Sequence, residues 1–398
     1  MSKVRAQYEA YPYPERDPRD EKMRLITGSP SQPLEIDHFI FGGQRDWSQP
    51  FRALVAGGGT GDGLIQLAQL LTSAGRPHEI TYVDLSSASR KVAEARAKAR
   101  GLGSIRFVTG SLMDAADHGV FDYIDCCGVL HHLPEPREGF AALRAALADG
   151  GGLGFMVYAP YGRSGVYPLQ EAFGTLFGDL EPRAQLKAAK AVMTRLPEGH
   201  AFKVNANIGD HKQSDAGFYD LLLHSQDRAF AVPDLLAALE ESDWELSGFV
   251  MPAQYDLARF VPDLPKDMPS AERMALAEKL SGVIKTHTGY AVARGSGARP
   301  ARGRNRALIP HIQGVEAAAL ARAIAAGQRP KLTLGGVTAE IALPKEAARV
   351  IAGADGRRSL DAIAKGAGLD PITMGTLWGK VETSLEPWGL LLYSRLLV

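Results

Sequence analysis

The chain has little cysteine, no excess charge of either sign and no long apolar run. Its only two cysteines, Cys126 and Cys127, are adjacent, which excludes a disulfide framework and a zinc site with four cysteine ligands. Because 45 Lys and Arg balance 45 Asp and Glu, a generally basic nucleic-acid coat protein is excluded, although a local basic patch is not. No stretch approaches the roughly 18–20 consecutive apolar residues of a membrane helix, and the polar start lacks a signal-peptide core. We therefore expect a cytoplasmic protein without a membrane partner.

The 398 residues, 45% of them hydrophobic, suffice for two or three domains with buried cores. Short apolar runs alternate with helical stretches from residue 51 to 158, pause over 159–231 and resume to 293. This alternation predicts an α/β fold, a Rossmann-like, doubly wound sheet of seven strands. The expected strands are 53–56, 79–84, 105–108, 123–127, 153–158, 244–251 and 287–293. A helical insertion at 159–231 would cover the carboxyl ends of the strands, where ligands bind in such sheets.

Composition divides the chain further. Residues 1–49, rich in Pro, Gly, Arg and Asp, are predicted to form an arm with short helical turns, followed by the sheet domain at 50–294. Residues 295–306 are rich in arginine and glycine, which is typical of a solvated linker. The short helices, turn and terminal strand of 307–398 resemble a winged helix, a small α+β accessory domain.

The strongest motif is LVAGGGTGDG, in the turn between the first strand and the first helix of the sheet. Gly57, Gly59 and Gly61 allow close approach of a ligand to the backbone, and the following helix start offers free N–H groups. A dinucleotide site needs a third glycine five residues after the first, but Asp62 or Leu64 stands there. The alternating glycines therefore indicate a smaller nucleoside with an amino-acid tail.

Other residues near the predicted strand ends complete a nucleoside site. Asp84 ends the second strand, where a carboxylate can accept both ribose hydroxyls. Ser111 and Leu112 are placed to border the adenine, and the backbone of 126–128 lies beside the glycine loop. The expected cofactor-binding residues are Gly57, Gly59, Thr60, Gly61, Asp84, Leu85, Ser111, Leu112, Cys126 and Cys127.

These motifs, followed in order by FDYIDCCGVLHHLPEP and GGGLGFMVY, resemble the class I S-adenosylmethionine (SAM)-dependent methyltransferases. The resemblance implies SAM as cofactor, S-adenosylhomocysteine as product, and methyl transfer in line to a nucleophile. The arm and the insertion at 159–231 predict an enclosed pocket, which favours a nucleophile on a small molecule or an exposed protein side chain. One position departs from the pattern. Many members carry an acidic residue two positions before the first glycine, where this chain has Val55. Another group must then bind the amino group of the methionine portion.

The segment QYEAYPYPER, residues 7–16, resembles the QYExxPYPxW arm that folds over the cofactor site of some bacterial methyltransferases. Tyr8, Tyr11 and Tyr13 would offer aromatic faces to the sulfonium cation or to the substrate. The alternative is an aromatic arm that only packs on the domain surface.

Candidate catalytic and substrate-binding residues follow the fourth and fifth strands and lie in the insertion. The candidate bases are His131, His132, His211 and His224. The candidate substrate contacts are Tyr11, Tyr13, Tyr158, Tyr161, Arg163 and Tyr167. The histidines could instead shape a pocket floor, and the tyrosines could serve loop packing. We expect no metal, because adjacent histidines on a strand end would point apart, and we expect the acids of 210–230 on the solvated face of a helix.

Two alternative functions remain from the sequence. A winged-helix-like unit and an arginine-rich linker could hold RNA, which would suit an RNA base methyltransferase. However, the second short helix of that unit offers only Lys380 as a basic residue, so nucleic acid is disfavoured as a partner. The other alternative is a catalytically idle SAM-binding regulatory protein. The identity of the acceptor and the presence of a homodimer are open.

Overall fold

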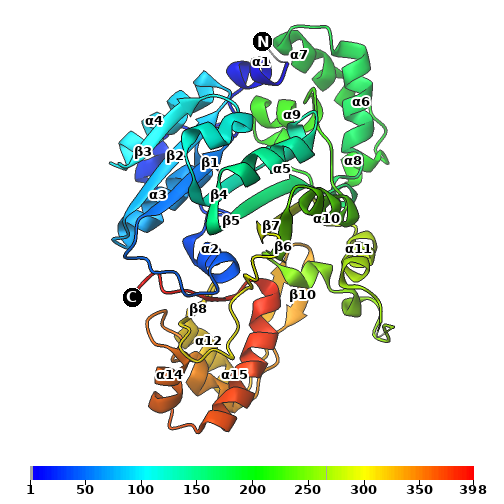
Figure 1. The fold of residues 1–398 in the computed structure, drawn as a ribbon. Coiled ribbons are helices and arrows are strands. Elements are labelled where there is room, and N and C mark those ends of the chain that lie inside the picture. The colour runs from blue at the N-terminus through cyan, green and yellow to red at the C-terminus, as the bar shows by residue number, and fades with distance from the viewer. Residues whose placement is uncertain (1–2, 266) are drawn as a thin grey trace.

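The computed structural model describes residues 3–265 and 267–398 (Figure 1). Seven strands form one sheet in the order β3-β2-β1-β4-β5-β7-β6, with β7 antiparallel to both of its neighbours. The strands are β1 (Phe51–Ala56), β2 (His78–Asp84), β3 (Ile105–Thr109), β4 (Phe121–Cys127), β5 (Leu147–Tyr158), β6 (Trp244–Phe249) and β7 (Thr286–Ala293). The predicted Rossmann-like seven-stranded sheet is therefore confirmed.

Each face of the sheet has its own apolar core. Leu54 and Ala56 of the central strand β1 lie in one core, whereas Ala53 and Val55 lie in the other, as the alternation of side chains along a strand requires. Helices α5 (Pro136–Ala145), α10 (Val232–Glu241) and α11 (Ser270–Ser281) pack on the first face. Helices α2 (Pro33–Ile40), α3 (Asp62–Ser73) and α4 (Ser87–Ala99) cover the second. Because β1 is buried on both sides, its carboxyl end is held firmly where the glycine loop begins.

The fifth strand begins earlier than its sequence indicates. Helix α5 ends at Ala145, and β5 starts at Leu147 instead of the predicted residue 153. Leu147 pairs with Phe121, and the register then jumps so that Gly152 pairs with Tyr123. The intervening residues bulge out through Gly150, whose φ of +74° favours glycine. Helical periodicity does not reveal such a bulge.

The insertion forms a helical layer with its own core. Its helices are α6 (Val166–Phe177), α7 (Pro182–Met193), α8 (Ala201–Val204) and α9 (Asp215–Leu222). They lie in the chain between β5 and α10, where the sequence places the insertion, and they share a cluster of buried apolar residues. In Figure 1 this layer (green) and the C-terminal unit (yellow to red) lie at opposite ends of the molecule.

The first 49 residues are more helical than the predicted arm. They contain α1 (Lys3–Ala10), a 3-10 turn at Pro18–Lys22 and the buried helix α2. Helix α2 begins with Pro33 at its first turn, where the missing N–H costs nothing, and it buries Ile36, Phe39 and Ile40 against the sheet. Residues 33–40 are therefore part of the sheet domain.

The C-terminal unit has a separate core around Trp378. Its elements are β8 (Pro310–Ile312), α12 (Ala317–Ala325), the hairpin β9 (Lys331–Leu334) and β10 (Val337–Glu340), α13 (Ala348–Ile351), α14 (Leu360–Gly366), α15 (Pro371–Leu385) and β11 (Leu391–Tyr393). Strand β11 pairs with β8 in a two-stranded antiparallel sheet. The winged-helix resemblance stays a prediction.

The expected solvated linker is packed against both units. Two of its arginines, Arg299 and Arg302, form ion pairs with Glu245 and Glu386, and Arg294, just before it, pairs with Glu240. Ala301 is buried, and a Cβ on Gly303 would lie 2.7 Å from the Trp378 ring. The composition of this segment predicts solvation because it holds many arginines and no acid. The acids that pair with these arginines lie elsewhere in the chain.

A buried acid joins helix α2 to the end of the C-terminal unit. Asp37 is 0% exposed and accepts hydrogen bonds from Trp47 Nε1 (2.9 Å), Ser394 Oγ (2.7 Å) and Arg395 N (2.9 Å). Next to it, His38 Nδ1 accepts from the Tyr393 N–H at 3.2 Å. The C-terminal unit is therefore docked through buried polar contacts. Among the helices of the described residues, we find none with the length and apolar character needed to cross a membrane.

Candidate functional site

The glycine loop after β1 has no space for a side chain at its alternating glycines. Gly57, Gly59 and Gly61 have φ values of +72°, +52° and +99°. A Cβ on Gly57 would lie 2.5 Å from Val129, and one on Gly59 would lie 2.9 Å from the Tyr13 carbonyl oxygen. Gly61 also stands at the N-cap of α3. These positions therefore require glycine, as the sequence motif predicts.

Asp84 lies where a ribose-binding carboxylate is expected. It ends β2, beside the glycine loop at the end of β1. Its Oδ2 accepts from Gly59 N at 2.8 Å and its Oδ1 from Ser86 N at 2.8 Å. Desolvation raises the pKa of this carboxyl group. Each oxygen keeps a further lone pair for a hydroxyl donor.

The other expected cofactor residues surround the same strand ends. Ser111 caps the 3-10 turn Leu112–His118, Leu112 is buried in the core, and Leu85 is 38% exposed. Thr60 is buried, and its hydroxyl donates to the Pro14 carbonyl oxygen at 2.6 Å. Cys126 faces the core, whereas Cys127 is exposed. Surrounding protein still desolvates the Cys127 thiol and raises its pKa.

The N-terminal arm crosses from the glycine loop to the insertion. On one side, Arg16 forms a two-point ion pair with Asp62, the residue after Gly61, at 2.9 and 2.6 Å. On the other side, Tyr8 OH donates to Asp220 Oδ1 at 3.0 Å, and Tyr11 stacks on Tyr219. The arm thus lies over the predicted cofactor site, and its role as a lid stays a proposal.

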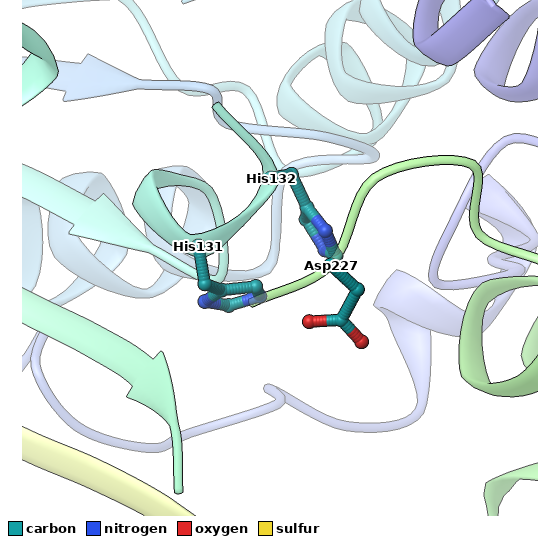
Figure 2. Close-up of side chains that lie close together, drawn as sticks. All are labelled: His131, His132 and Asp227. Carbon is teal, nitrogen blue, oxygen red and sulfur yellow. The ribbon is translucent and has the colours of Figure 1, made fainter. Parts of the chain in front are cut away.

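A cluster of histidines, acids and tyrosines lies where β4 and β5 end. His131 and His132 do not point apart, because they lie on the 3-10 turn Leu130–His132, not on a strand end, and their ring centroids are 4.1 Å apart. The ring of His224 stacks on His132 at 3.7 Å. Figure 2 shows the two adjacent histidines on their turn and Asp227 on the loop that faces it. The expectation that the two adjacent histidines point apart, which argued against a metal, is therefore wrong. Acids of 210–230 lie near the same histidines.

Two of those acids, Asp220 and Asp227, are buried and not solvated as expected, whereas Asp215 is exposed. Asp220 is 4% exposed, and the Asp227 side chain is 0% exposed. Tyr8 and Tyr158 donate to the two oxygens of Asp220. Asp227 Oδ2 accepts from Arg163 at 3.2 Å and from Gln170 at 2.9 Å. Desolvation raises the pKa of Asp220.

Two groups of three side chains bring one ligand atom each within 4.8 Å of one another: His131, His132 and Asp227, and His132, Asp220 and His224. Hydrogen bonds assign the tautomers of these histidines. His131 Nδ1 accepts from Tyr158 N, and His224 Nδ1 accepts from Gln226 N, so the neutral rings carry their protons on Nε2. His132 Nδ1 instead donates to the Gln226 carbonyl oxygen at 2.9 Å, which leaves a lone pair on Nε2. A single free imidazole lone pair favours proton transfer over metal binding.

His131 has an unpaired donor and the nearby Asp227 an unpaired acceptor. Nε2 of His131 and Oδ1 of Asp227 are buried, and neither has a hydrogen-bond partner within the described residues. Desolvation lowers the pKa values of His131 and His224, which keeps both rings neutral. A small polar guest is needed to satisfy both atoms.

One expected site residue, His211, lies apart from this cluster, because its ring packs against Phe202 in the insertion at a centroid distance of 4.8 Å. Tyr161 begins the 3-10 turn that ends at Arg163. Tyr13, Tyr158, Arg163 and Tyr167 do lie together: Arg163 covers the Tyr158 ring at 3.6 Å, and its Nε donates to the Tyr167 hydroxyl. Desolvation raises the pKa of Tyr13, and the nearby charges of Asp220 and Arg163 shift this pKa in opposite directions.

A cavity of about 670 Å³ opens beside the cluster, between α1, α6, α7 and α9. Residues that line it include Gln7, Tyr167, Gln170, Glu171, His224 and Asp227. Its described lining contains three acids and neither lysine nor arginine. This volume is within the usual range of small-molecule sites.

Comparisons with known proteins agree with this architecture. An uncharacterized Synechococcus protein, syc1184_c, is 33% identical over 266 residues, which cover 65% of this chain and 61% of that protein. PKMT2 from Rickettsia typhi has a similar fold, with a TM-score of 0.63, 14% identity, and coverage of 94% of this chain and 77% of that one. The structure of PKMT2 in complex with AdoHcy gives a TM-score of 0.62 at 13% identity, with the same coverage.

The family comparison concerns the part of the sheet that holds the glycine loop and Asp84. Residues 54–153 match the model of a methyltransferase domain. That range runs from the end of β1 to β5 and includes the turn with His131 and His132. It supports SAM as the cofactor predicted from the sequence. The central part of this chain thus has the sequence pattern of the methyltransferase domain family, on a Rossmann-like fold shared with PKMT2 over most of the chain.

Proposed function

We propose that the protein is a SAM-dependent methyltransferase. The observation that carries this proposal is the carboxylate of Asp84 hydrogen-bonded to Gly59 N, at the adjoining ends of β1 and β2. Loop glycines that admit no Cβ and an acid with free lone pairs fit a nucleoside with an amino-acid tail. The loop of 57–61 would hold the methionine portion, Asp84 the ribose, and Ser111 and Leu112 the adenine edge.

When bound, SAM supplies an electrophilic methyl group, and the electron pair of the broken methyl–sulfur bond remains on sulfur. The protein must then position the nucleophile and, where that nucleophile carries a proton, remove it. Tyr13 adjoins Gly59 and is subject to the charges of Asp220 and Arg163, so it links the cofactor side to the histidine cluster. The cluster is therefore the proposed place of the acceptor.

Within the cluster, we assign the general base to His132. Its Nδ1–H is held by the Gln226 carbonyl, so Nε2 has a lone pair to accept a proton. His131 and His224 carry protons on Nε2 and act as donors. His224 Nε2 lies 3.3 Å from Tyr8 OH, which in turn donates to Asp220.

The adjacent cavity favours a small molecule or a protein side chain over RNA. Three acids and no basic residue among its described lining would repel a phosphate backbone. The same lining accommodates a neutral or cationic acceptor. The RNA methyltransferase alternative would need a basic surface at this site, and the idle-protein alternative gives no reason for a base with an oriented lone pair.

We expect the purified protein to bind SAM and S-adenosylhomocysteine and not to bind NAD, because the glycine spacing lacks the pyrophosphate fingerprint. Isothermal titration calorimetry with each of the three ligands measures this directly. Micromolar NAD binding together with no SAM binding would contradict the proposed function. Tight SAM binding without methyl transfer to any component of a cell extract would favour the idle regulatory protein.

Substitution of His132 tests the base. We expect His132→Ala to lower methyl transfer from radiolabelled SAM into a cell extract by about 10²–10⁴-fold. S-adenosylhomocysteine affinity should stay within about 3-fold, since no cofactor contact is assigned to this ring. His211→Ala is the control, because that histidine lies apart from the cluster. Full activity of the His132 variant would remove the base from the mechanism.

A further inference from the structure

The missing acid of the glycine motif leaves the amino group of the methionine portion without its usual partner. Val55 occupies that position, two residues before Gly57, and it is 3% exposed in an apolar core. A primary ammonium group needs acceptors, and a carboxylate gives the strongest hydrogen bonds. A carboxylate at the same level of the sheet could take its place.

Asp125 stands at that level. In the parallel pairing of β1 and β4, Val55 and Asp125 are direct register partners. Residues in register on adjacent parallel strands have their side chains on the same face of the sheet. Asp125 also shares its face with Tyr123, two residues earlier, which lies in the same core as Val55. The carboxylate of Asp125 thus lies one strand away from position 55, at the same end of the sheet.

The surroundings of Asp125 do not neutralise its charge. The residue is 2% exposed, and its hydrogen-bond partners among the described residues are neutral hydroxyls, those of Ser31, 2.5 Å from Oδ2, and Tyr123. No lysine or arginine of the described residues forms an ion pair with it. A buried carboxylate without a cationic partner is costly, and desolvation raises its pKa to about 6.

Asp125 also adjoins the glycine loop and the start of α3. A Cβ on Gly63 would lie 3.6 Å from Asp125 Oδ2 and 2.4 Å from Ser31 Oγ, so the first turn of this helix comes close to the acid. Desolvation and the charge of Asp125 raise the pKa of the Cys127 thiol, two residues further along β4. The carboxyl group therefore lies at the carboxyl end of β4, next to the start of α3.

We propose that Asp125 binds the α-ammonium group of the methionine portion of SAM in place of an acid at position 55. This inference rests on the proposed function. Two other acids lie near the loop. Asp62 already pairs with Arg16 and Arg96, whereas Asp84 accepts from Gly59 N and Ser86 N and is assigned to the ribose. Asp125 has no cation among the described residues, and the ammonium group of the methionine portion would supply one. Ser31 then orients the carboxylate.

The test compares two ligands on two proteins. S-adenosylhomocysteine carries the amino group, and its deamino analogue, 5′-S-(3-carboxypropyl)-5′-thioadenosine, replaces that group with hydrogen. We expect Asp125→Asn to weaken S-adenosylhomocysteine binding by about 10–100-fold and binding of the analogue by less than about 3-fold, as for loss of one charge-assisted contact. Asp122→Asn, on the same strand at its far end, is the matched control and should affect neither ligand.

An equal loss of both ligands in the Asp125 variant would overturn the inference and leave the proposed function standing. Failure of the wild-type protein to bind S-adenosylhomocysteine would overturn the proposed function and this inference with it. If the asparagine variant does not fold, Asp125→Ser provides the same comparison with a smaller side chain. In the wild-type protein alone, the analogue should bind about 10-fold or more weakly than S-adenosylhomocysteine, and equal affinities would also overturn the inference.

Discussion

Replacing Asp84 with alanine should weaken the binding of SAM by about 10–150-fold, which corresponds to the loss of about 1.5–3 kcal/mol in charge-assisted hydrogen bonds. The carboxylate is the proposed acceptor for the ribose hydroxyls. It also accepts from Gly59 N and Ser86 N, so the substitution frees the glycine loop as well. Calorimetry with S-adenosylhomocysteine measures the change.

The matched control is Glu79→Ala, because Glu79 is an exposed acid on the same strand, β2. That variant should keep wild-type affinity and a wild-type melting curve. If the Asp84 variant also kept wild-type affinity, the ribose contact would have to lie elsewhere. A lower melting temperature without a loss of affinity would restrict Asp84 to its hydrogen bonds with the backbone.

The second large effect concerns stability. Asp37→Asn should lower the free energy of unfolding by about 3 kcal/mol or more. The carboxylate accepts four hydrogen bonds, from Arg45 N, Trp47 Nε1, Ser394 Oγ and Arg395 N. An asparagine of the same shape has one acceptor oxygen, and its NH₂ group would face donors in a site with 0% exposure. Urea unfolding monitored by circular dichroism gives the difference.

Asp46→Asn serves as the control for Asp37, because Asp46 caps an exposed turn through Ser48 and should change stability by less than about 1 kcal/mol. Equal stabilities of the Asp37 variant and the wild type would mean that the docking of the C-terminal unit does not depend on this acid. A loss confined to the first of two unfolding transitions would show that the two units unfold separately.

The cofactor side of the site was predictable because its signals are local. The glycines of 57–61 and Asp84 follow strands whose apolar runs are evident in the sequence, and their spacing carries the chemistry. The parallel order of the strands follows from the strand–helix alternation. The proposed role of Asp125, in contrast, depends on its register with Val55 on the neighbouring strand, which the sequence alone does not reveal.

The acceptor side was largely missed because its partners are distant in the chain. Asp220 looked like a solvated acid of an amphipathic helix, yet it is buried against Tyr8, which lies 212 residues away. The two adjacent histidines were placed on a strand end, where the backbone in fact turns into a 3-10 helix. Local periodicity describes which face of a helix is polar, but not whether another segment covers that face.

The contact between Asp37 and residues 394–395 has a consequence for the order of folding. It joins positions 357 and 358 residues apart, so a long loop must close before it forms. During synthesis, helix α2 can reach the sheet early, but its buried acid stays without two of its four donors until residues 394–395 have left the ribosome. Until then Asp37 favours solvent over the core. The sheet domain therefore completes its packing late, and a chain stalled before this segment would expose α2 to aggregation.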